Sequence, residues 1–438
     1  SSGNYTDFVG ITDEAISSAA SGSVIVQGGV ITNTGLVPDS VSANTAAAFE
    51  TGNASLGEQR IVYDTANNKA VVLYADTGNS TYLTAVVGTV SGAAISFGTP
   101  VVLQSNEVGE IALAYDANAQ KVVAAYKNNA VPFPGRAKVG TVSGTSISFG
   151  SAVDFHTGSI AGTDATYDST SQKVILSYGS SAGGHLIVGT ISGTSISFGT
   201  EYDFTASAID YTAVTYDTNA QKVVLAYTDS GNSSYGTAAV GTVSGTSISV
   251  GSATVLTNFV AAPLYVEYEP VAQKTVVAYA NRGVSPLNWS ARVGTVSGTT
   301  ISFGTETAAG SSGASGGLTF DTSTGHMIQA YQEASSGTSP VIQISTVSGT
   351  DITFGGSLSV LTSEPSAVLR IAYDPDTSQI IGINKVDSSS SVGRTFNVNQ
   401  GLTTKSDYFV QTDGTLSTTT STVPAGRALS ATSILLEG

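Results

Sequence analysis

The chain has 438 residues, and 32 Asp and Glu against 16 Lys and Arg give it a formal net charge of −16 at pH 7. Charged residues make up 11% of the chain, less than half of the roughly 25% found in ordinary soluble proteins. This shortage of cations argues against nucleic-acid binding, and no apolar run reaches the ~18 residues of a membrane-spanning helix. The absence of Cys excludes disulfides, thiol catalysis and Cys-ligated zinc.

Imidazole side chains are equally scarce. His156, His185 and His326 are the three histidines, and they lie far apart in the sequence. A metal site needs several such ligands close together. We therefore expect no metal and no cofactor.

A repeated phrase organises most of the chain. An aromatic residue followed by Asp or Glu returns every 49 to 53 residues, ahead of a short polar turn and an apolar run. The aromatic positions are Tyr63, Tyr115, Tyr167, Tyr216, Tyr268, Phe320 and Tyr373. A period of this length is typical of a repeat architecture.

Each full copy contains four short runs rich in β-branched and aromatic residues. In the fourth copy they are 211–216, 222–227, 237–243 and one that starts at 247. Ser244-Gly245 separates the last two runs and is predicted as a two-residue hairpin turn. Four antiparallel strands per ~52 residues, repeated seven times, predict an all-β fold with a seven-bladed β-propeller.

The seventh copy lacks its fourth strand, which would leave an unpaired sheet edge. One period before the fourth strand of the first copy lies Ser42–Thr51, so we expect this stretch to close the last blade. Residues 37–400 then form the propeller. Residues 1–36 and 401–438 form a small split β-domain for attachment or oligomerisation, which leaves a homo-oligomer open.

Two kinds of segment resemble known proteins. The runs VGTVSGTSISFG (Val139–Gly150) and YDTNAQKVVLAY (Tyr216–Tyr227) resemble repeats of tail-fibre and appendage proteins of marine bacteriophages. The flanks at Phe8–Gly29 and Tyr408–Leu436 are similar to a small domain of phage tail and appendage proteins. The resemblance implies a protein of the virion surface, outside the cell, with other virion proteins as partners and a role in host attachment.

The acidic residue after each repeated aromatic suggests two interpretations. Seven carboxylates could form a ring of metal sites. Asp also opens turns by accepting hydrogen bonds from the backbone just after it. Lys follows five residues later in five copies and would face the carboxylate across the turn. We favour structural turns.

The loops between the second and third strands differ almost completely between copies, whereas the other turns hardly change. Repeat proteins often bind ligands on the face where such variation gathers. These loops carry candidate ligand-binding residues suited to stacking on a sugar: Tyr82, Phe133, His185, Tyr235 and Trp289. Neutral drift of unconstrained loops is the alternative interpretation.

An enzyme would place acids or arginines in the central channel. Innermost strands offer Glu58, Glu110, Asp164 and Asp210, with Arg60 and Arg370. The offsets of the four acids from the repeated aromatic differ between copies, so we predict no catalytic residue. We expect a non-enzymatic adhesin that binds a host surface glycan or receptor. The alternatives are a structural virion protein, either a capsid decoration or a fibre spacer, and a glycan-cleaving propeller enzyme.

Overall fold

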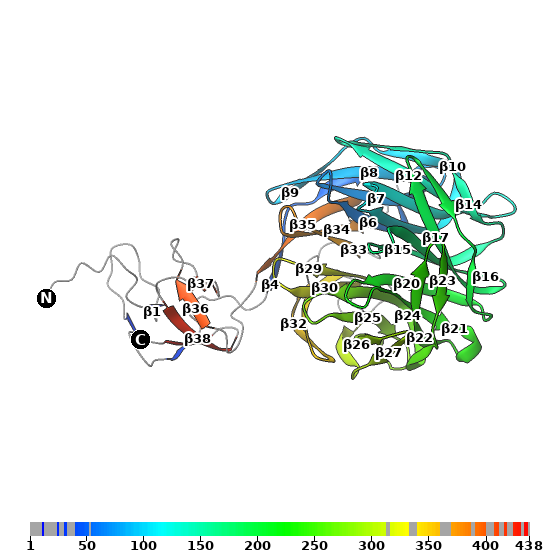
Figure 1. Ribbon diagram of the computed structural model, residues 1–438. Coiled ribbons are helices and arrows are strands. Elements are labelled where there is room, and N and C mark those ends of the chain that lie inside the picture. The colour runs from blue at the N-terminus through cyan, green and yellow to red at the C-terminus, as the bar shows by residue number, and fades with distance from the viewer. Residues whose placement is uncertain are drawn as a thin grey trace. The chain divides into compact units, whose positions relative to one another are not determined.

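The protein is all-β in a computed structural model (Figure 1), which confirms the predicted class; the described residues contain no α-helix and two short 3-10 turns, η1 (Thr77–Asn79) and η2 (Ser230–Asn232). No described helix is long and apolar enough to cross a membrane. The structure describes the backbone of residues 11–12, 24–25, 30–32, 40–51, 54–311, 316–332, 340–359, 369–386, 390–399, 407–410, 416–417, 424–430 and 433–436.

Contacts divide the chain into two compact units. The terminal unit comprises Ser1–Val41 and Val398–Gly438, and the repeat body comprises Ser42–Asn397. The boundaries predicted from the sequence lie within five residues of these positions. In the terminal unit, Val30 in β3 pairs with Leu435 in β39, so strands from the two ends of the chain share a sheet. Its described strands are β1 (Ile11–Thr12), β2 (Val24–Ile25), β3 (Val30–Thr32), β36 (Asp407–Val410), β37 (Leu416–Ser417), β38 (Pro424–Ser430) and β39 (Ser433–Leu436).

The repeat body consists of antiparallel modules, and each of the first six is built around four consecutive strands. We number the modules 1 to 7 along the chain. Module 1 contains β6 (Ala54–Asp64), β7 (Lys69–Asp76), β8 (Tyr82–Ser91) and β9 (Ala94–Phe97). Module 2 contains β10 (Val101–Asp116), β11 (Lys121–Asn128), β12 (Gly135–Ser143), β13 (Ser146–Phe149) and β14 (Val153–His156). Module 3 contains β15 (Ile160–Asp168), β16 (Lys173–Ser180), β17 (Gly183–Ser192), β18 (Ser195–Phe198) and β19 (Tyr202–Thr205).

Modules 4 to 6 repeat this order. Module 4 contains β20 (Ile209–Asp217), β21 (Lys222–Asp229), β22 (Tyr235–Ser244) and β23 (Ser247–Val250). Module 5 contains β24 (Thr254–Glu269), β25 (Lys274–Asn281), β26 (Asn288–Ser297), β27 (Thr300–Phe303) and β28 (Thr307–Ser311). Module 6 contains β29 (Gly316–Asp321), β30 (His326–Gln332), β31 (Pro340–Ser348) and β32 (Asp351–Ser359). The long strands β10 and β24 each begin beside the preceding module and continue as the first strand of their own.

Module 7 combines both ends of the repeat body. Its strands β33 (Leu369–Asp374), β34 (Gln379–Lys385) and β35 (Ser391–Asn399) are joined by β4 (Ser40–Ala43) and β5 (Ala47–Glu50). Within β5, Ala47 and Ala48 pair with Gly393 and Val392 of β35. This is the stretch from which the sequence analysis takes the missing strand.

The first strands of the modules form a continuous series of contacts. Each of them contacts the first strand of the next module, and β33 of module 7 contacts β6 of module 1, as the orange and blue ribbons of Figure 1 show. None of the described sheets closes on itself. The apolar cores lie between neighbouring modules; the one between modules 7 and 1 contains Phe49, Val72, Tyr74, Val86 and Ile383.

The repeated carboxylates are turn residues, as predicted. Asp64 Oδ1 accepts hydrogen bonds from the backbone N–H of Ala66 (3.0 Å) and Asn67 (3.1 Å). The other six acidic residues accept backbone bonds at the same turn: Asp116, Asp168, Asp217, Glu269, Asp321 and Asp374. The five predicted lysines are their register partners, as in Asp64 and Lys69.

The predicted hairpin turn is displaced by one residue. Ser244 belongs to β22 and pairs with Ser247, so the two turn residues are Gly245 and Thr246. Gly245 has φ +61°, a conformation that glycine adopts without steric cost. Because Ser244 and Ser247 are the last paired residues, Gly245 is the first of the two turn residues, and it is the one that adopts the positive φ.

Phe49 provides a test of how the repeat body is held together. Its buried ring lies 5.3 Å from Tyr74 and 5.2 Å from Phe97, both in module 1, while its backbone belongs to module 7. Phe49→Ala should therefore lower the free energy of unfolding by about 3–5 kcal/mol in denaturant titration. Phe133→Ala, at a ring that is 40% exposed, is the control and should change it by less than about 1 kcal/mol. Equal effects of the two variants would contradict the bridging role of Phe49.

Candidate functional site

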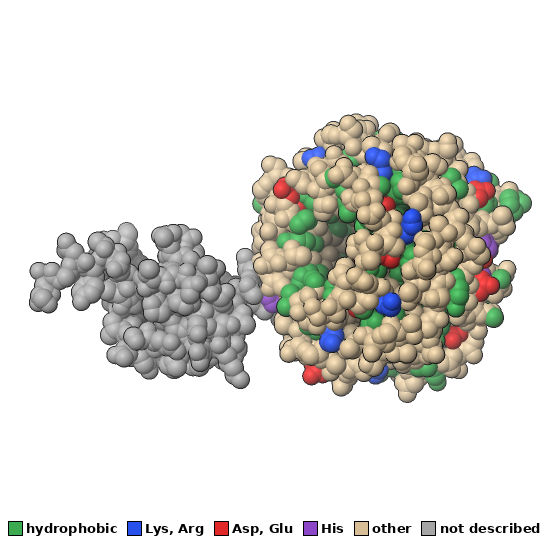
Figure 2. Space-filling view, in the orientation of Figure 1, with side chains coloured by type: hydrophobic (Ala, Val, Ile, Leu, Met, Phe, Trp, Pro, Cys, Tyr) green, Lys and Arg blue, Asp and Glu red, His purple; other side chains and the backbone are tan. Residues whose placement is uncertain are grey.

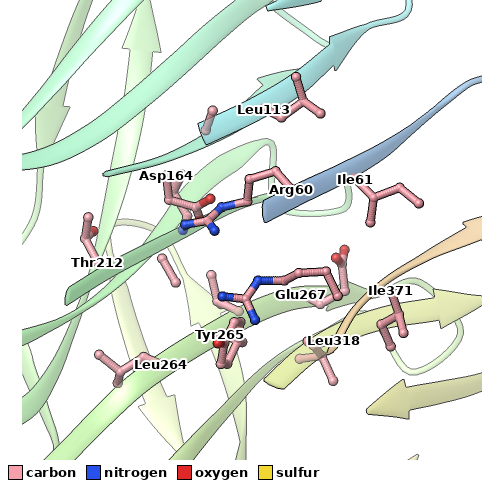
Figure 3. A pocket seen from close by; sticks show the side chains of 16 residues that line it. Arg60, Ile61, Leu113, Asp164, Thr212, Leu264, Tyr265, Glu267, Leu318 and Ile371 are labelled. Atoms are coloured by element: carbon pink, nitrogen blue, oxygen red, sulfur yellow. The ribbon is translucent and has the colours of Figure 1, made fainter. Parts of the chain in front are cut away.

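A cavity of about 190 Å³ lies among the first strands of the modules (Figure 3). All seven first strands contribute to its lining, which includes Arg60 from β6, Asp164 from β15, Glu267 from β24 and Arg370 from β33. Figure 3 shows the labelled side chains of Arg60, Asp164 and Glu267 directed into the same space. Residues distant in sequence therefore meet here because each module presents its first strand to the same centre.

A repeating register places these side chains. Arg60, Asp164, Tyr265 and Arg370 are each the third residue before the repeated aromatic of their module. At this position, modules 2, 4 and 6 carry Ala112, Ala213 and Gly317. Large polar side chains and small residues thus occupy equivalent places, and the small residues leave room for the cavity.

A second cavity of about 680 Å³ adjoins the first and shares Arg60, Tyr265 and Arg370 with it. Residues of the first strands complete its lining, among them Glu110, Asp210, Tyr211 and Pro263, together with Arg282 from the loop after β25. We call the two cavities together the axial cavity and the second its mouth.

Irregular pairing shapes the mouth. The first strands of modules 2 to 5 each carry a register shift at this point, as between Gly109 and Ala112 in β10. Such bulges bend a strand and redirect its side chains. Glu110 accordingly has φ +50°, and its Oε2 accepts a 2.7 Å hydrogen bond from the N–H of Gly162 in module 3.

The arginines of the axial cavity are held by backbone carbonyls. Arg60 Nη1 donates to Gln59 O (2.9 Å), Arg370 Nη1 to Gly316 O (2.6 Å) and Arg282 Nε to Ala262 O (2.9 Å). The Arg370 guanidinium also lies 5.4 Å from the ring centre of Tyr265. These contacts orient the three guanidinium groups at the cavity.

Two acids deep in the axial cavity have raised pKa values. Burial raises the pKa of Glu267 to about 7; the N–H of Tyr268, 3.1 Å from its Oε1, opposes the shift, and the nearby charge of Asp164 adds to it. Burial also raises the pKa of Asp164, against the attraction of Arg60, a 2.9 Å bond from Val214 N–H and the attraction of Arg370. A carboxyl group with a pKa near 7 can donate or accept a proton at neutral pH.

The mouth lies on the same face as the variable loops. Because the strands are antiparallel, the loop after each second strand returns to the end where the first strand began. In module 5, Ala261, where β24 begins to pair with β25, lies opposite Asn281 at the end of the second strand. Arg282, the next residue, belongs to the variable loop; it donates its N–H to Val260 O (3.0 Å) and lines the mouth.

The predicted ligand-binding residues are placed unequally. Phe133 is 40% exposed, and Tyr82 and Tyr235 are half-buried at the starts of β8 and β22. His185 and Trp289, predicted to lie in the variable loops, belong instead to β17 and β26 and are buried. Trp289 stacks on Tyr331 at 5.6 Å between ring centres and donates Nε1–H to Gln329 Oε1 (2.9 Å), so neighbouring strands cover it.

The channel residues considered in the sequence analysis are brought together more closely than expected. Arg60, Glu110, Asp164, Asp210 and Arg370 all line the axial cavity. The side chain of Glu58 lies outside the described residues. The sequence comparison used only the distances of the four acids from the repeated aromatic, and these distances differ between copies. It therefore missed that Arg60, Asp164 and Arg370 share one position, which a comparison of the seven copies residue by residue would have found. Glu267 and Arg282 were missed because they occupy other positions.

Outside the axial cavity, His156 and His185 come within 5.6 Å between ring centres. The expectation that the histidines are too scattered to meet is therefore wrong for this pair. Sequence distance misled because modules 2 and 3 pack side by side, with β14 of one against β18 of the other, and this brings the two rings together.

The raised pKa of Glu267 predicts a specific pH dependence. Between about pH 4.5 and 7 the folded protein retains a proton that the unfolded chain has released, so the free energy of unfolding should fall as pH rises. Glu267→Gln removes this titrating group. The free energy of unfolding of the variant minus that of wild type should therefore rise between pH 4.5 and 7, by at most about 3 kcal/mol. Denaturant titrations at several pH values measure the difference. Asp210→Asn, at an exposed carboxylate of the mouth, is the control, and an equal slope for both variants would contradict the assignment.

Comparison with known proteins identifies no family. No family model matches the chain, and no curated protein matches it. A crystal structure described as a protein of unknown function from Dyadobacter fermentans matches with a TM-score of 0.46 and 11% sequence identity, covering 85% of this chain and 100% of that chain.

Proposed function

We propose that the seven modules are the blades of a seven-bladed β-propeller inserted into a small split β-domain. The series of contacts between first strands, including β33 with β6, supports this arrangement. The pairing of β5 with β35 supports it further, because it supplies outer strands to the last module from the other end of the repeat body. A closed propeller brings its two ends together, which suits insertion at one loop of a host domain.

We propose further that the protein is a non-enzymatic adhesin on the surface of a virion, within a tail fibre or appendage, and binds a host surface glycan. The phage-like runs support the location. The observation that carries the binding role is that the axial cavity opens on the face of the variable loops, with Arg282 belonging to both. A cavity at the centre of a face whose loops vary between modules is a suitable recognition site.

The chemistry of the mouth favours a sugar. Tyr211 is 39% exposed and offers an aromatic face for the apolar side of a sugar ring. Asp210 supplies acceptors and Arg282 supplies donors for sugar hydroxyl groups. Figure 2 shows charged side chains scattered singly over a mostly uncharged face, whereas the axial cavity gathers both signs of charge. Phe133, Tyr82 and Tyr235 remain candidates at the surrounding loops.

Glycan binding is testable with matched arginine variants. The wild-type protein is screened on a glycan array, and dissociation constants for the strongest ligand are measured by calorimetry. Arg282→Ala and Tyr211→Ala should each weaken binding about tenfold or more, a loss of about 1.4 kcal/mol. Arg136→Ala is the control, because this arginine does not line the cavity and instead pairs with Asp154, 2.6 Å from Nε to Oδ1. Binding that survives both cavity variants unchanged would contradict the proposed site.

A glycan-cleaving enzyme is the second candidate, and the raised pKa of Glu267 beside Asp164 favours it. Glycosidases use one carboxyl group as a general acid and a second as nucleophile or base. Incubation of the array ligand with wild type and Glu267→Gln distinguishes the two roles. Sugar fragments released by wild type and not by the variant would make the protein an enzyme.

The proposed virion location requires a separate measurement. Immunogold labelling of intact particles, with antibody against the repeat body, should mark the tail. Regular label over the head would instead favour a capsid decoration, the structural alternative. Absence of label from all particles would contradict the virion assignment.

A further inference from the structure

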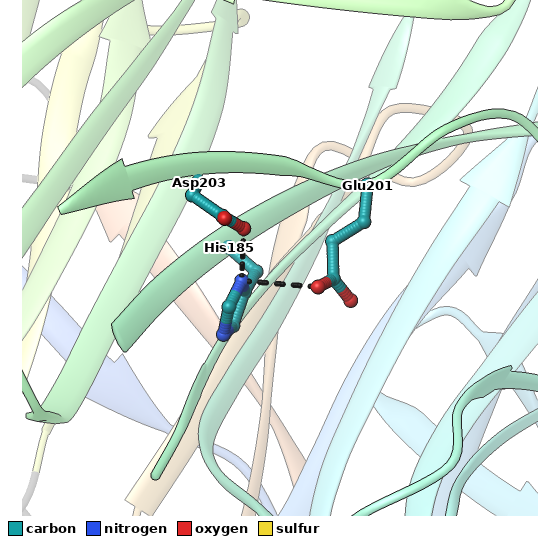
Figure 4. A group of neighbouring side chains, drawn as sticks. All are labelled: His185, Glu201 and Asp203. Atoms are coloured by element: carbon teal, nitrogen blue, oxygen red, sulfur yellow. Dashed lines mark hydrogen bonds and ion pairs between the residues drawn. The ribbon is translucent and has the colours of Figure 1, made fainter. Parts of the chain in front are cut away.

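A second cluster of polar side chains lies at the outer strands of modules 2 and 3 (Figure 4). It comprises His156 at the end of β14, His185 in β17, Asp203 in β19 and Glu201 one residue before β19. His185 Nδ1 lies 2.7 Å from Asp203 Oδ1 and 3.2 Å from Glu201 Oε1, as the dashed lines of Figure 4 mark. One imidazole nitrogen thus faces two carboxylates.

We propose that His185, Glu201 and Asp203 form a binding site for a divalent transition-metal ion of the Zn²⁺ type. One ligand atom from each residue lies within 4.8 Å of the other two. Zinc binds such atoms at about 2.0–2.2 Å, which places neighbouring ligands roughly 3–3.5 Å apart. The two separations from Nδ1 are close to this range, so small side-chain movements would admit the ion.

The surrounding contacts orient the proposed ligands. His185 Nε2 lies 2.7 Å from Ser180 Oγ, which also accepts the Ala182 N–H at 3.0 Å. An Nε2–H donated to Ser180 would leave the lone pair of Nδ1 for the metal. His156 Nδ1 (2.9 Å) and the Tyr178 hydroxyl both contact Glu201 Oε2, so Glu201 Oε1 is the atom turned toward His185.

Exposure and ligand type favour a transition metal with access from solvent. The side chain of His185 is 1% exposed, whereas that of Asp203 is 71% exposed. An ion could therefore enter from the Asp203 side and retain water as a further ligand. One imidazole with two carboxylates suits zinc, while Ca²⁺ and Mg²⁺ prefer sites made of oxygen ligands.

The same contacts also place Ser180, His185 and Asp203 in the order of a nucleophilic triad. In that mechanism the carboxylate is buried and orients the histidine alone. Here Asp203 is largely exposed, and Glu201 faces the same nitrogen. These two features favour metal binding.

Calorimetry on the full chain without a polyhistidine tag, after treatment with a chelator, tests the site. Zn²⁺ should bind with a stoichiometry of one and at least tenfold more tightly than Mg²⁺. Asp203→Ala should weaken Zn²⁺ binding tenfold or more and abolish the rise in melting temperature that Zn²⁺ gives the wild type. The exposed position of Asp203 makes loss of folding a poor explanation for this result.

Asp154→Ala is the matched control, because Asp154 is an exposed carboxylate of the neighbouring strand β14 that pairs with Arg136. It should leave Zn²⁺ binding unchanged. Equal Zn²⁺ affinity in wild type and Asp203→Ala would overturn the proposal, as would binding of Mg²⁺ as tight as that of Zn²⁺. Glycan binding through Arg282 and Tyr211 is measured separately, so neither result depends on the other.

Discussion

The contact between the repeated aromatic of one module and the acidic turn of the module before it is the interaction on which the repeat body depends. Asp64 fixes its own turn, and the Tyr115 hydroxyl accepts a 3.2 Å hydrogen bond from the N–H of Ala66 in that turn. Burial is the main cause that raises the pKa of Tyr115 and of Tyr63, and a hydrogen bond to the acidic residue of the preceding module is the second. For Tyr63 that carboxylate is Asp374 of module 7, so the same contact joins the last module to the first.

This contact works together with a close approach of backbones elsewhere on the same interfaces. A Cβ built on Gly150 would lie 1.9 Å from the carbonyl oxygen of Thr194 in the next module, and Gly98 meets Thr145 in the same way. Only glycine permits such an approach. The spacing of the modules is therefore set at two places, by the aromatic and its turn and by the glycine that follows the fourth strand. Uniform spacing then places equivalent residues of each first strand around one centre.

The sequence predicts the parts of the fold that depend on local chemistry. Strand runs, acidic turns and the glycine of the hairpin follow from residue types over a few positions, and the hairpin was misplaced by only one residue. The burial of Trp289 could not be predicted in this way, because the residues that cover it, Tyr331 and Gln329, belong to the next module. The meeting of His156 with His185 likewise depends on the packing of module 2 against module 3, where β14 contacts β18. Within module 3, a register shift between β17 and β19 places Asp203 opposite His185.

The axial cavity was accessible to sequence analysis only in part, because it consists of departures from the repeat. Ala112, Ala213 and Gly317 show what the position three residues before the aromatic requires when only packing matters. Arg60, Asp164 and Arg370 at that position therefore need another explanation. Mutual attraction of the charges is one, since both arginines lower the pKa of Asp164.

That explanation does not extend to Glu267. Burial and the charge of Asp164 raise its pKa to about 7, and the N–H of Tyr268 is the group that opposes the shift. A buried carboxyl group with so little compensation lowers the stability of the fold at neutral pH. Thr215 and Thr319 occupy the same position in modules 4 and 6 without this cost, so the fold itself does not require a carboxyl group there. Glu267 lies deep in the axial cavity, which we propose as the binding site, and a local cost of this kind is typical of sites that bind a ligand.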